Sequence, residues 1–487
     1  MRCTPLPLKP TRGIVRTNSI DDVMDLAKKA DVVDLRFADM LGTWQHFTMP
    51  THMLTKAVFE NGYPFDGSSI RGFQAIQESD LVLMPDPGTA FIDPSDTDPT
   101  IVILCDIVDP TEMKPYGRDP RHVARKAIEH LQGTGIANDA EFGPELEFFV
   151  FDDVRYSEEP NAASYRVDSS EGWWQSGLDL QPNLGRQLQT KGGYFPVPPA
   201  DRSQGIRNAI IAALEEAGVS VERHHHEVAT GGQAEIDVHY DALLRMADKV
   251  MIYKYLVKNV AHAHGMAATF MPKPLYGDNG TGMHVHQSLW NGDRNLMYDT
   301  ASEYANLSDL GRWYVGGILA HTRAIMALAA PTTNSYKRLV PGFEAPTTLA
   351  YGQRNRSAII RIPTVPRHPE ATHLEFRAPD AMANPYLCFS ALLMAGLDGI
   401  ERKLEPGDPL DTNVFELPAE EAAKYEHTPA TLSEALEALE EDHEFLTKGG
   451  VFSTDLLETF IEYKRENEIT PLRSRPHPLE FVLYFDA

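Results

Sequence analysis

The spacing of apolar residues divides the chain into helices and strands. Apolar positions three and four residues apart predict helices over 120–131, 201–217, 241–264, 307–328, 385–401 and 431–445. Shorter alternating or continuous apolar runs predict strands over 32–37, 43–49, 81–84, 101–106 and 140–151. Ser19 is placed to cap a short helix that runs to Leu26. Because the order is irregular and the strands look mostly antiparallel, we expect an α+β fold.

Prolines indicate a domain boundary near residue 115. Asp109-Pro110 and Lys114-Pro115 interrupt the pattern, so we expect a small N-terminal domain over 19–115 and a large second domain over 116–487. Residues 1–18 hold four basic residues, no acid and no continuous apolar run. This composition favours a disordered extension, with a transit peptide as the alternative. The helix over 431–445, with acids between its leucines, is predicted to be a solvated outer helix.

Composition and charge narrow the class of protein. The 487 residues include 44 Lys and Arg and 70 Asp and Glu, for a net charge of −26, which argues against nucleic-acid and anionic-membrane partners. The apolar stretch 313–330 contains His321 and Arg323, so it is predicted to be a buried helix rather than a membrane span. Three scattered cysteines favour a reducing cytoplasm. An anionic substrate would require a local reversal of charge.

Two glutamates in an apolar strand are the first candidate site residues. Glu145 and Glu147 are two residues apart, so their side chains point to the same face. Like charges on one face repel unless a cation lies between them, and hard divalent ions prefer oxygen ligands. The pair therefore predicts a metal site, and a solvent-facing strand edge is the alternative.

Two further segments carry potential metal ligands. Extended pieces on either side of Gly231-Gly232 predict a hairpin that brings Glu227 and Glu235 together, although a His-rich run such as 224–226 is often a surface feature. After the glycine turn over 279–282, the next strand places three residues on one face: His284, His286 and Ser288. A Gly-x-Gly turn alone is nonspecific and is most often structural.

Basic residues concentrate between 334 and 377. They include Lys337, Arg338, Arg354, Arg356, Arg361 and Arg377. Guanidinium groups bind carboxylates and phosphates in a bidentate manner and stay charged at any working pH. Arg361 stands inside the apolar run 359–363, where an unpaired charge would be costly. We therefore expect an anionic ligand or a buried carboxylate beside it, rather than a solvated arginine.

Seven segments in the same order resemble class I (bacterial-type) glutamine synthetase. They are 65–69 (FDGSS), 145–147 (ELE), 225–230 (HHEVAT), 279–284 (NGTGMH), 337–346 (KRLVPGFEAP), 355–358 (NRSA) and 384–387 (NPYL). The resemblance implies a small β-grasp-like N-terminal domain followed by a large catalytic domain with a curved antiparallel sheet. It also implies a homo-oligomer, a dodecamer of two stacked hexameric rings with active sites between subunits.

The resemblance also implies cofactors and site residues. Two or more divalent ions, Mg²⁺ or Mn²⁺, would be held by Glu147, Glu227 and Glu235 and by Glu145, His284 and Glu375. Positions matching the ATP site are Glu222, His286, Ser288, Arg356 and Arg361, and those matching the glutamate site are Asn279, Gly280, Arg338, Glu344 and Arg377. Ammonium would be bound by Asp66, Ser69 and Tyr194, with Asp66, Glu344 and Arg356 as catalytic residues. Two ions and four arginines would make this pocket cationic.

The implied activity is ligation of L-glutamate and ammonia to L-glutamine at the expense of ATP. ATP first phosphorylates the glutamate side chain, and ammonia then attacks the acyl phosphate. A γ-glutamylamide or γ-glutamylpolyamine synthetase that uses an organic amine is one alternative, and a non-catalytic scaffold is another. The intact segment 66–69 and Tyr194 favour ammonia, and none of the six metal ligands is missing.

Two positions depart from the family pattern. Phe415 stands where many members carry a tyrosine that is modified by adenylylation, so this modification is impossible there; Tyr425 lies nearby. Glu370 and His373 replace basic residues that usually face the nucleotide. The first departure removes a regulatory site, and the second weakens the expected affinity for the nucleotide.

Overall fold

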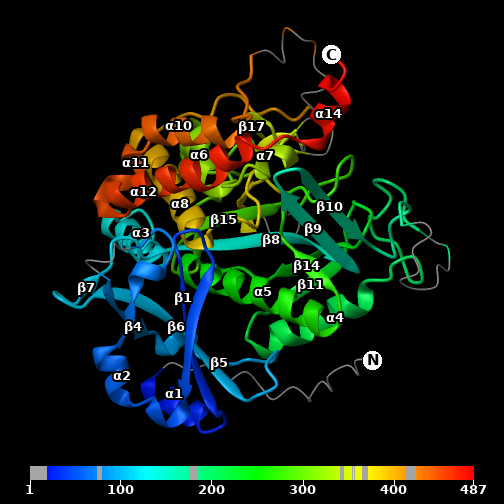
Figure 1. Ribbon diagram of the computed structural model, residues 1–487. Coiled ribbons are helices and arrows are strands. Elements are labelled where there is room, and N and C mark those ends of the chain that lie inside the picture. Colours follow the sequence, from blue (N-terminus) through cyan, green and yellow to red (C-terminus); the bar gives the residue numbers. More distant parts are fainter. Residues whose placement is uncertain are drawn as a thin grey trace.

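The computed structural model describes residues 19–73, 79–175, 185, 187–340, 345–353, 355, 357–364, 371–412, 418, 420 and 424–487. Two sheets organise these residues, one in the N-terminal part and one in the centre of the molecule (Figure 1). A smaller two-stranded ribbon, β9 (Asp153–Glu159) and β10 (Ala162–Asp168), projects from the second sheet.

The N-terminal sheet has seven strands in the order β2-β1-β6-β4-β3, with β5 and β7 paired to β6. The elements in chain order are α1 (Ile20–Ala27), β1 (Val32–Ala38), β2 (Trp44–Pro50), α2 (Lys56–Asn61), β3 (Tyr63–Asp66), β4 (Asp80–Pro85), β5 (Phe91–Ile92), β6 (Thr100–Asp109) and β7 (Lys114–Pro115). Ser19 caps α1 in a reciprocal capping box with Asp22, so the predicted start of this helix is confirmed. β1 and β6 run parallel, and the other pairs are antiparallel.

Strand β6 is buried on both faces, which explains its continuous apolar run. Ile101, Ile103 and Ile107 pack with residues of α1 and α2 in the N-terminal core. Val102 and Leu104, on the opposite face, belong to the core of the second domain. The two domains therefore share this strand as a wall, and its apolar residues do not alternate with polar ones.

The second sheet has ten strands in the order β11-β12-β8-β15-β19-β18-β17, with β13 and β14 paired to β8 and β16 to β15. The strands are β8 (Asp139–Phe151), β11 (Val221–His226), β12 (Gln233–Val238), β13 (Asp241–Ala242), β14 (Ala267–Thr269), β15 (Met283–Asn291), β16 (Arg294–Asn295), β17 (Thr348–Gly352), β18 (Ala358–Arg361) and β19 (Leu374–Phe376). Among the described strand pairs of this second sheet, only β17–β18 is parallel. The predicted α+β class with a curved antiparallel sheet is confirmed.

Helices cover one face of this sheet (Figure 1). They are α3 (Pro120–Thr134), α4 (Gln204–Glu216), α5 (Leu243–Ala263), α6 (Asp309–Ala329) and α8 (Pro385–Arg402). α10 (Leu432–Glu441) and α11 (Glu444–Thr447) pack on α6 and α8, and the remaining helices are α7 (Ser335–Arg338), α12 (Thr454–Lys464), α13 (Thr470–Arg473) and α14 (Pro478–Tyr484). Alternate residues of β8 face the helices: Phe142 stacks on Phe389 of α8 at 5.0 Å, and Leu146 and Phe148 are fully buried. The residues between them, which include Glu145 and Glu147, point to the other face.

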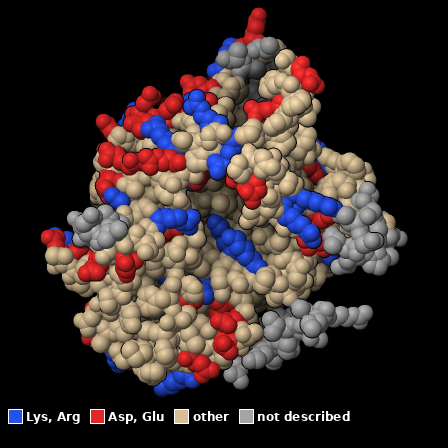
Figure 2. All heavy atoms as spheres, in the orientation of Figure 1, with Lys and Arg blue, Asp and Glu red and all other residues tan. Residues whose placement is uncertain are grey.

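The helix predicted over 431–445 differs from expectation in one respect. It is two helices, α10 and α11, because the backbone leaves the helical region at Asp442. Leu432, Leu436 and Leu439 of α10 are buried in the main core, while Glu437 and Glu440 are exposed. The prediction of a solvated outer helix is therefore correct for the acidic face of α10, whereas its leucine face is buried. Figure 2 shows acidic side chains gathered over the region of α10 to α12.

The apolar stretch 313–330 was predicted to form a buried helix rather than a membrane span. Residues 313–330 lie almost entirely in α6, and most of its residues are buried in the protein core, as predicted. Among the described helices, none combines the length and apolarity that crossing a bilayer requires.

A buried histidine links three helices and predicts a pH-dependent stability. His321 of α6 makes Nδ1 and Nε2 contacts of 2.7 and 2.9 Å with Asp442 and Asp398, and its ring stacks on Phe445 at 4.0 Å. Burial alone would lower the pKa of His321, but hydrogen bonds to Asp442 and Asp398 outweigh it and raise the pKa above the usual value. The protonated ring therefore stabilises the fold fully below about pH 6.5, and this contribution is lost as pH rises through the raised pKa.

We expect His321→Asn to lower the thermal midpoint more at pH 6 than at pH 9. Asp398 also accepts from Arg402 and Lys448, so part of its charge stays compensated in the variant. Thermal melts of wild type and variant across this pH range measure the difference. A difference that grows with pH would contradict the assignment of a protonated ring.

Candidate active site

One face of the large sheet carries a row of ionisable side chains. Strand register places Glu145 of β8 between Asp237 of β12 and His284 of β15. One step along the sheet, Glu147 lies opposite Glu235. On the other side, Glu375 of β19 lies between His286 of β15 and Arg361 of β18. β8 is a central strand, so the alternative of a solvent-facing strand edge for Glu145 and Glu147 does not hold.

The first predicted group of metal ligands converges at the junction of β11 and β12. The hairpin around Gly231-Gly232 brings Glu227 and Glu235 to either side of His225, whose Nδ1 and Nε2 atoms lie 3.6 and 3.7 Å from their carboxylates. These three residues offer ligand atoms within 4.8 Å of one another. His225 is largely buried and His226 is 1% exposed, so this His-rich run is not a surface feature.

Glu147, the third predicted ligand, lies opposite Glu235 in the β8–β12 pairing. Burial, followed by the charge of Glu227, raises the pKa of Glu147 to about 8. Burial and then the charge of Glu147 raise the pKa of Glu235 well above its usual value. Carboxylates that crowd each other in this way are the donor set that a hard divalent ion requires, so the residues fit Mg²⁺ or Mn²⁺.

The second predicted group is also assembled. Glu145, His284 and Glu375 offer ligand atoms within 4.8 Å of one another. His284 Nδ1 lies 3.4 Å from Glu145 Oε2 and 3.6 Å from Glu375 Oε1. Burial opposes ionisation of Glu145, but its hydrogen bonds with His284 and His286 outweigh this and lower its pKa. Glu145 thus stays ionised and available to a cation.

Arginines surround Glu375, as the apolar run around Arg361 predicts. Glu375 is 2% exposed, and its carboxylate lies 2.6 Å from Arg361 Nε and 3.2 Å from Arg377 Nε. Burial opposes its ionisation, while the charges of the nearby histidines and arginines lower its pKa. The buried carboxylate that Arg361 was expected to have is therefore Glu375.

The glycine turn before β15 lies against Arg338. A Cβ on Gly280 would stand 2.4 Å from the Pro272 carbonyl oxygen, so only glycine fits this position. Arg338 is buried, and its guanidinium donates to the carbonyl oxygens of Arg377, Ala378 and Pro379. The neighbouring Asn279 Oδ1 is buried, and no described residue donates to it. The unpaired Asn279 oxygen suits a cationic group and the anchored Arg338 suits an anionic group. Together they fit a ligand that carries one positive and one negative group.

The predicted nucleotide residues lie along β11, β15 and β18. Glu222 is exposed at a bulge of β11, between Val221 and Arg223. Ser288 Oγ accepts from Trp290 Nε1 at 2.8 Å. His373 stands 5.0 Å from the His286 ring, and burial, followed by the charge of His286, lowers the pKa of His373 to about 4. A neutral His373 supplies no positive charge for phosphates.

The predicted ammonium residues are divided between the domains. Tyr194 stacks on Phe195 at 4.0 Å and approaches the edge of His225 at 5.7 Å, so it borders the first ligand group. Asp66 and Ser69 belong to the N-terminal domain, where Asp66 accepts from Ser68. Among the described residues, no hydrogen bond or ion pair joins Asp66 or Ser69 to the large sheet. Glu344, Arg356, Glu370 and Phe415 lie outside the described residues.

Three residues of this face were not predicted from the sequence. His225 lies between Glu227 and Glu235, Asp237 shares their face, and Gln233 Nε2 donates both to Glu147 Oε2 at 3.1 Å and to the Gly280 carbonyl at 2.8 Å. Residues 233, 235 and 237 lie on the same face of one strand, and this alternation could have identified Asp237 and Gln233 from the sequence.

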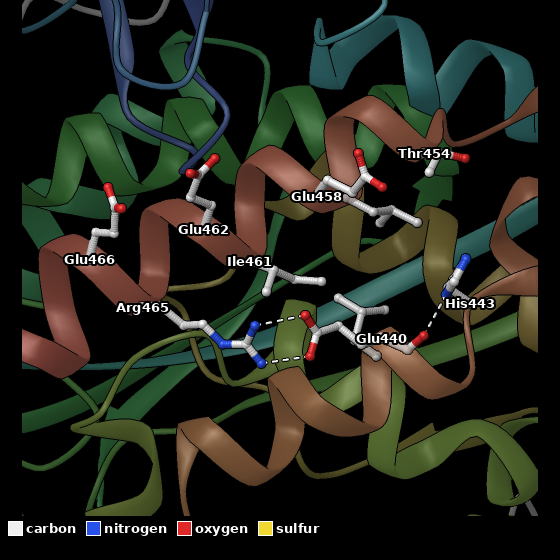
Figure 3. A pocket seen from close by; sticks show the side chains of 10 residues that line it. Glu440, His443, Thr454, Glu458, Ile461, Glu462, Arg465 and Glu466 are labelled. Carbon is white, nitrogen blue, oxygen red and sulfur yellow. Dashed lines mark hydrogen bonds and ion pairs between the residues drawn. The ribbon is translucent and has the colours of Figure 1, made fainter.

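A separate groove lies between α10 and α12 (Figure 3). It encloses about 490 Å³, and Arg465 crosses it to bind Glu440 through two contacts of 2.6 and 2.7 Å. None of the carboxylates on the sheet lines this groove. It therefore has no part in the site.

Two groups of carboxylates and histidines on one sheet face, bordered by buried arginines, define a metal-dependent enzyme that acts on anionic substrates. The glutamine synthetase β-grasp domain model matches residues 29–110, and the catalytic domain model matches residues 117–484. The chain belongs to the glutamine synthetase family. The domain boundary near residue 115 lies between the two matched ranges.

Individual relatives agree with this assignment. The chain is 53% identical to a glutamine synthetase of Mycobacterium bovis over 96% of this chain and 99% of the relative, and 52% identical to that of Aquifex aeolicus over 96% and 98%. Among solved structures, the cryo-EM structure of Plasmodium falciparum glutamine synthetase has a TM-score of 0.88 and 30% identity over 97% of this chain and 100% of that chain. A GmaS/ADP complex has a TM-score of 0.80 and 28% identity over 95% and 99%. The curated relatives give no support to the organic-amine alternative.

Proposed function

We propose that this enzyme forms L-glutamine from L-glutamate, ammonia and ATP through γ-glutamyl phosphate. The observation that carries this proposal is the convergence of both ligand groups on one sheet face, beside the Gly280 turn and Arg338. Identities of 53% and 52% to curated glutamine synthetases, each over 96% of this chain, support the proposal. A non-catalytic scaffold would not need to keep Glu227 close to Glu235 or to keep Glu145, His284 and Glu375 together.

We assign Glu147, Glu227 and Glu235 to one divalent ion and Glu145, His284 and Glu375 to a second. Mg²⁺ or Mn²⁺ bound there would neutralise charge on the phosphates of ATP. Because hard divalent ions take oxygen and imidazole ligands, the donor sets suit either ion. The strained carboxylates around Glu147 support this assignment more strongly than their number does.

Phosphoryl transfer requires that negative charge be held in place. Glu222, His286, Ser288, Arg356 and Arg361 are proposed to bind the nucleotide. The γ-carboxylate of glutamate attacks the terminal phosphorus of ATP, and ADP leaves. Arg361, fixed by Glu375 at 2.6 Å, offers its remaining N–H groups to the transferred phosphoryl group at any working pH.

Glutamate is proposed to bind at Asn279, Gly280, Arg338, Glu344 and Arg377. The unpaired Asn279 oxygen accepts from the substrate ammonium group, and Arg377 lies beside Glu375 where a substrate carboxylate can approach. Arg338 is held by three backbone carbonyls, so it cannot swing away when the site is empty. Such preorganisation lowers the entropy cost of binding.

Ammonia is proposed to arrive as ammonium at Asp66, Ser69 and Tyr194. Hydrogen bonds from the Ser68 hydroxyl and then the Ser68 N–H lower the pKa of Asp66, which keeps its carboxylate ionised. A carboxylate binds the cation and accepts its proton, and the neutral ammonia attacks the acyl carbon as phosphate leaves. Glu344 is proposed to assist and to exclude water, which would hydrolyse the acyl phosphate.

A homo-oligomer is proposed to complete the site, because Asp66 lies in a different domain and has no described contact with the large sheet. We propose twelve subunits in two hexameric rings. The C-terminal α14 supports an assembly, since Phe481, Val482 and Leu483 are 57%, 80% and 56% exposed. Cys105 and Cys388 are buried free thiols, which supports a cytoplasmic location.

The double variant Phe481→Asp/Val482→Asp is expected to assemble less well than wild type. Charges placed on this apolar helix would be buried at any contact between subunits. Light scattering measures the mass, for which we expect twelve subunits in wild type. A wild-type mass of a single subunit would contradict the assembly.

Phosphate release tests the function directly. The purified protein with Mg²⁺, ATP and glutamate should release phosphate with ammonium and not with putrescine or ethanolamine. Turnover only with an organic amine would move the protein to the amide-synthetase class. No turnover with any amine would favour the scaffold.

A further inference from the structure

Glu171 is a buried carboxylate that the proposed function does not use. It is 3% exposed and lies shortly after the ribbon strand β10. Its Oε1 accepts from the backbone N–H groups of Arg202 and Ser203 at 2.6 and 2.9 Å. The backbone carbonyl oxygen of Glu171 accepts from the Leu188 N–H at 2.8 Å. Glu171 therefore binds both ends of the segment 188–203.

The other carboxylate oxygen of Glu171 contacts the strand that leads to a proposed metal ligand. Oε2 lies 3.2 Å from Nε2 of His226, the last residue of β11. His226 is 1% exposed, and its Nδ1–H donates to the Glu227 carbonyl oxygen at 2.7 Å. Because a carbonyl oxygen only accepts, this hydrogen bond fixes the ring orientation that presents Nε2 to Glu171. The pair of Glu171 and His226 thus joins the segment 188–203 to the backbone of Glu227.

Between its two ends, the segment 188–203 lies against the end of β11. The Gly193 N–H donates to the Val228 carbonyl oxygen at 3.0 Å, and the residue after Tyr194 donates from its N–H to the His226 carbonyl oxygen at 3.3 Å. A Cβ on Gly193 would stand 2.4 Å from the Glu227 carbonyl oxygen, so this close approach requires glycine. The backbone on both sides of Tyr194 is therefore bound to β11 and the turn after it.

Tyr194 depends on this backbone for its position. It is 51% exposed, and its ring stacks on Phe195, which is 56% exposed. Rings with this exposure have little packing to hold them, since exposed side chains change rotamer rapidly. The backbone hydrogen bonds therefore set the Tyr194 ring beside His225, 5.7 Å away.

We propose that Glu171 and His226 are positioning residues that keep Tyr194 beside Glu227. The inference rests on the proposed function, in which Tyr194 binds ammonium and Glu227 binds a divalent ion. β11 is held by its pairing with β12, so loss of the Glu171 carboxylate displaces the segment 188–203 rather than the strand. Because a misplacement of about 1 Å can cost about a hundredfold in rate, an anchor outside the site governs the use of ammonium.

Glu171→Ala is expected to raise the KM for ammonium at least about tenfold and to change the KM for ATP less than about twofold. Alanine removes the carboxylate that the segment 188–203 and His226 share. The loss of kcat/KM should be smaller with hydroxylamine, which is uncharged at neutral pH and needs no site for a cation. Equal losses with both amines, or an equal rise of both KM values, would overturn the inference, since a purely structural role impairs all substrates alike.

Two further variants provide the rescue and the control. Glu171→Gln keeps an oxygen for the N–H groups of Arg202 and Ser203, so it should return the KM for ammonium to within about threefold of wild type. Asp152→Ala is the matched control: Asp152 accepts from the Ser170 N–H at 2.5 Å, one residue before Glu171. This control should leave both KM values unchanged. A rise of the KM for ammonium as large as that in Glu171→Ala would overturn the inference.

Hydrogen–deuterium exchange of the full-length protein tests the anchor without turnover. In Glu171→Ala, the amides of the segment 188–203 should exchange at least about tenfold faster, while those of β12 keep their wild-type rates. Unchanged exchange in the segment would overturn the inference. An inactive wild type whose segment still responds to the substitution would support the anchor and refute the proposed function alone.

Discussion

Glu147→Gln is expected to lower the rate of glutamine formation at least about a thousandfold, because cation-mediated charge neutralisation contributes several kcal/mol to phosphoryl transfer. Glu147 lies opposite Glu235, and the charge of Glu227 adds to burial in raising the pKa of Glu147. Glutamine, of the same size, keeps the packing and removes the charge of Glu147. Steady-state kinetics at saturating Mg²⁺ measure the loss.

The effect of Glu147→Gln on the thermal midpoint should change sign when metal is removed. In EDTA, Glu147→Gln is expected to raise the thermal midpoint, since it relieves repulsion within the group. With Mg²⁺ present, wild type should be the more stable, because a ligand that binds only the folded state adds stability. Glu141→Gln, on the same strand and outside both groups, should change neither comparison. Equal midpoints in EDTA would count against a crowded carboxylate group.

Arg121→Met is expected to destabilise the protein by about 3–5 kcal/mol, because it breaks a buried ion-pair network between the domains. Arg121 of α3 contacts Asp248 of α5 at 2.9 Å and two carboxylates of the N-terminal domain, Asp106 at 2.6 Å and Asp86 at 2.8 Å. Methionine leaves these carboxylates short of a partner in a buried position. The thermal midpoint and proteolysis near residues 110–119 measure the loss.

An exposed pair provides the control for Arg121. Arg155 binds Asp153 at 2.7 Å on the surface of the β9–β10 ribbon. Exposed pairs contribute between about 0 and 1 kcal/mol, so Arg155→Met should change the midpoint little. Similar losses in both variants would contradict a specific role of Arg121 at the domain junction.

Local sequence patterns predicted the elements well where burial is one-sided. The helix that begins at Pro120 and the strand ending at Phe151 have the predicted bounds to within three residues, because their apolar periodicity is set by a single packed face. The pattern was less informative for the helix over 431–445. There, the break at Asp442 depends on the backbone after α10 and on its packing against α6, which no periodicity encodes.

The candidate site was predicted in part from chemistry and in part from resemblance. Alternation alone placed Glu145 and Glu147 on one face, and the apolar run around Arg361 called for a carboxylate nearby. The pairing of Glu145 with His284, and of Arg361 with Glu375, joins strands far apart in the chain. Resemblance grouped Glu145 with His284 but assigned Arg361 and Glu375 to different ligand sets, and the pairing of β18 with β19 brings those two together. The roles of these residues remain predictions.

The sequence by itself determined which side chains share a face, since a strand alternates with period two and a helix with period 3.6. It also determined that a protein with a net charge of −26 needs cations wherever it binds anions. Only the tertiary structure decided which face lies next to which. Register between distant strands set Asp237 beside Glu145 and opposite Arg223, because hydrogen bonds between strands, and no local preference, fix that neighbourhood.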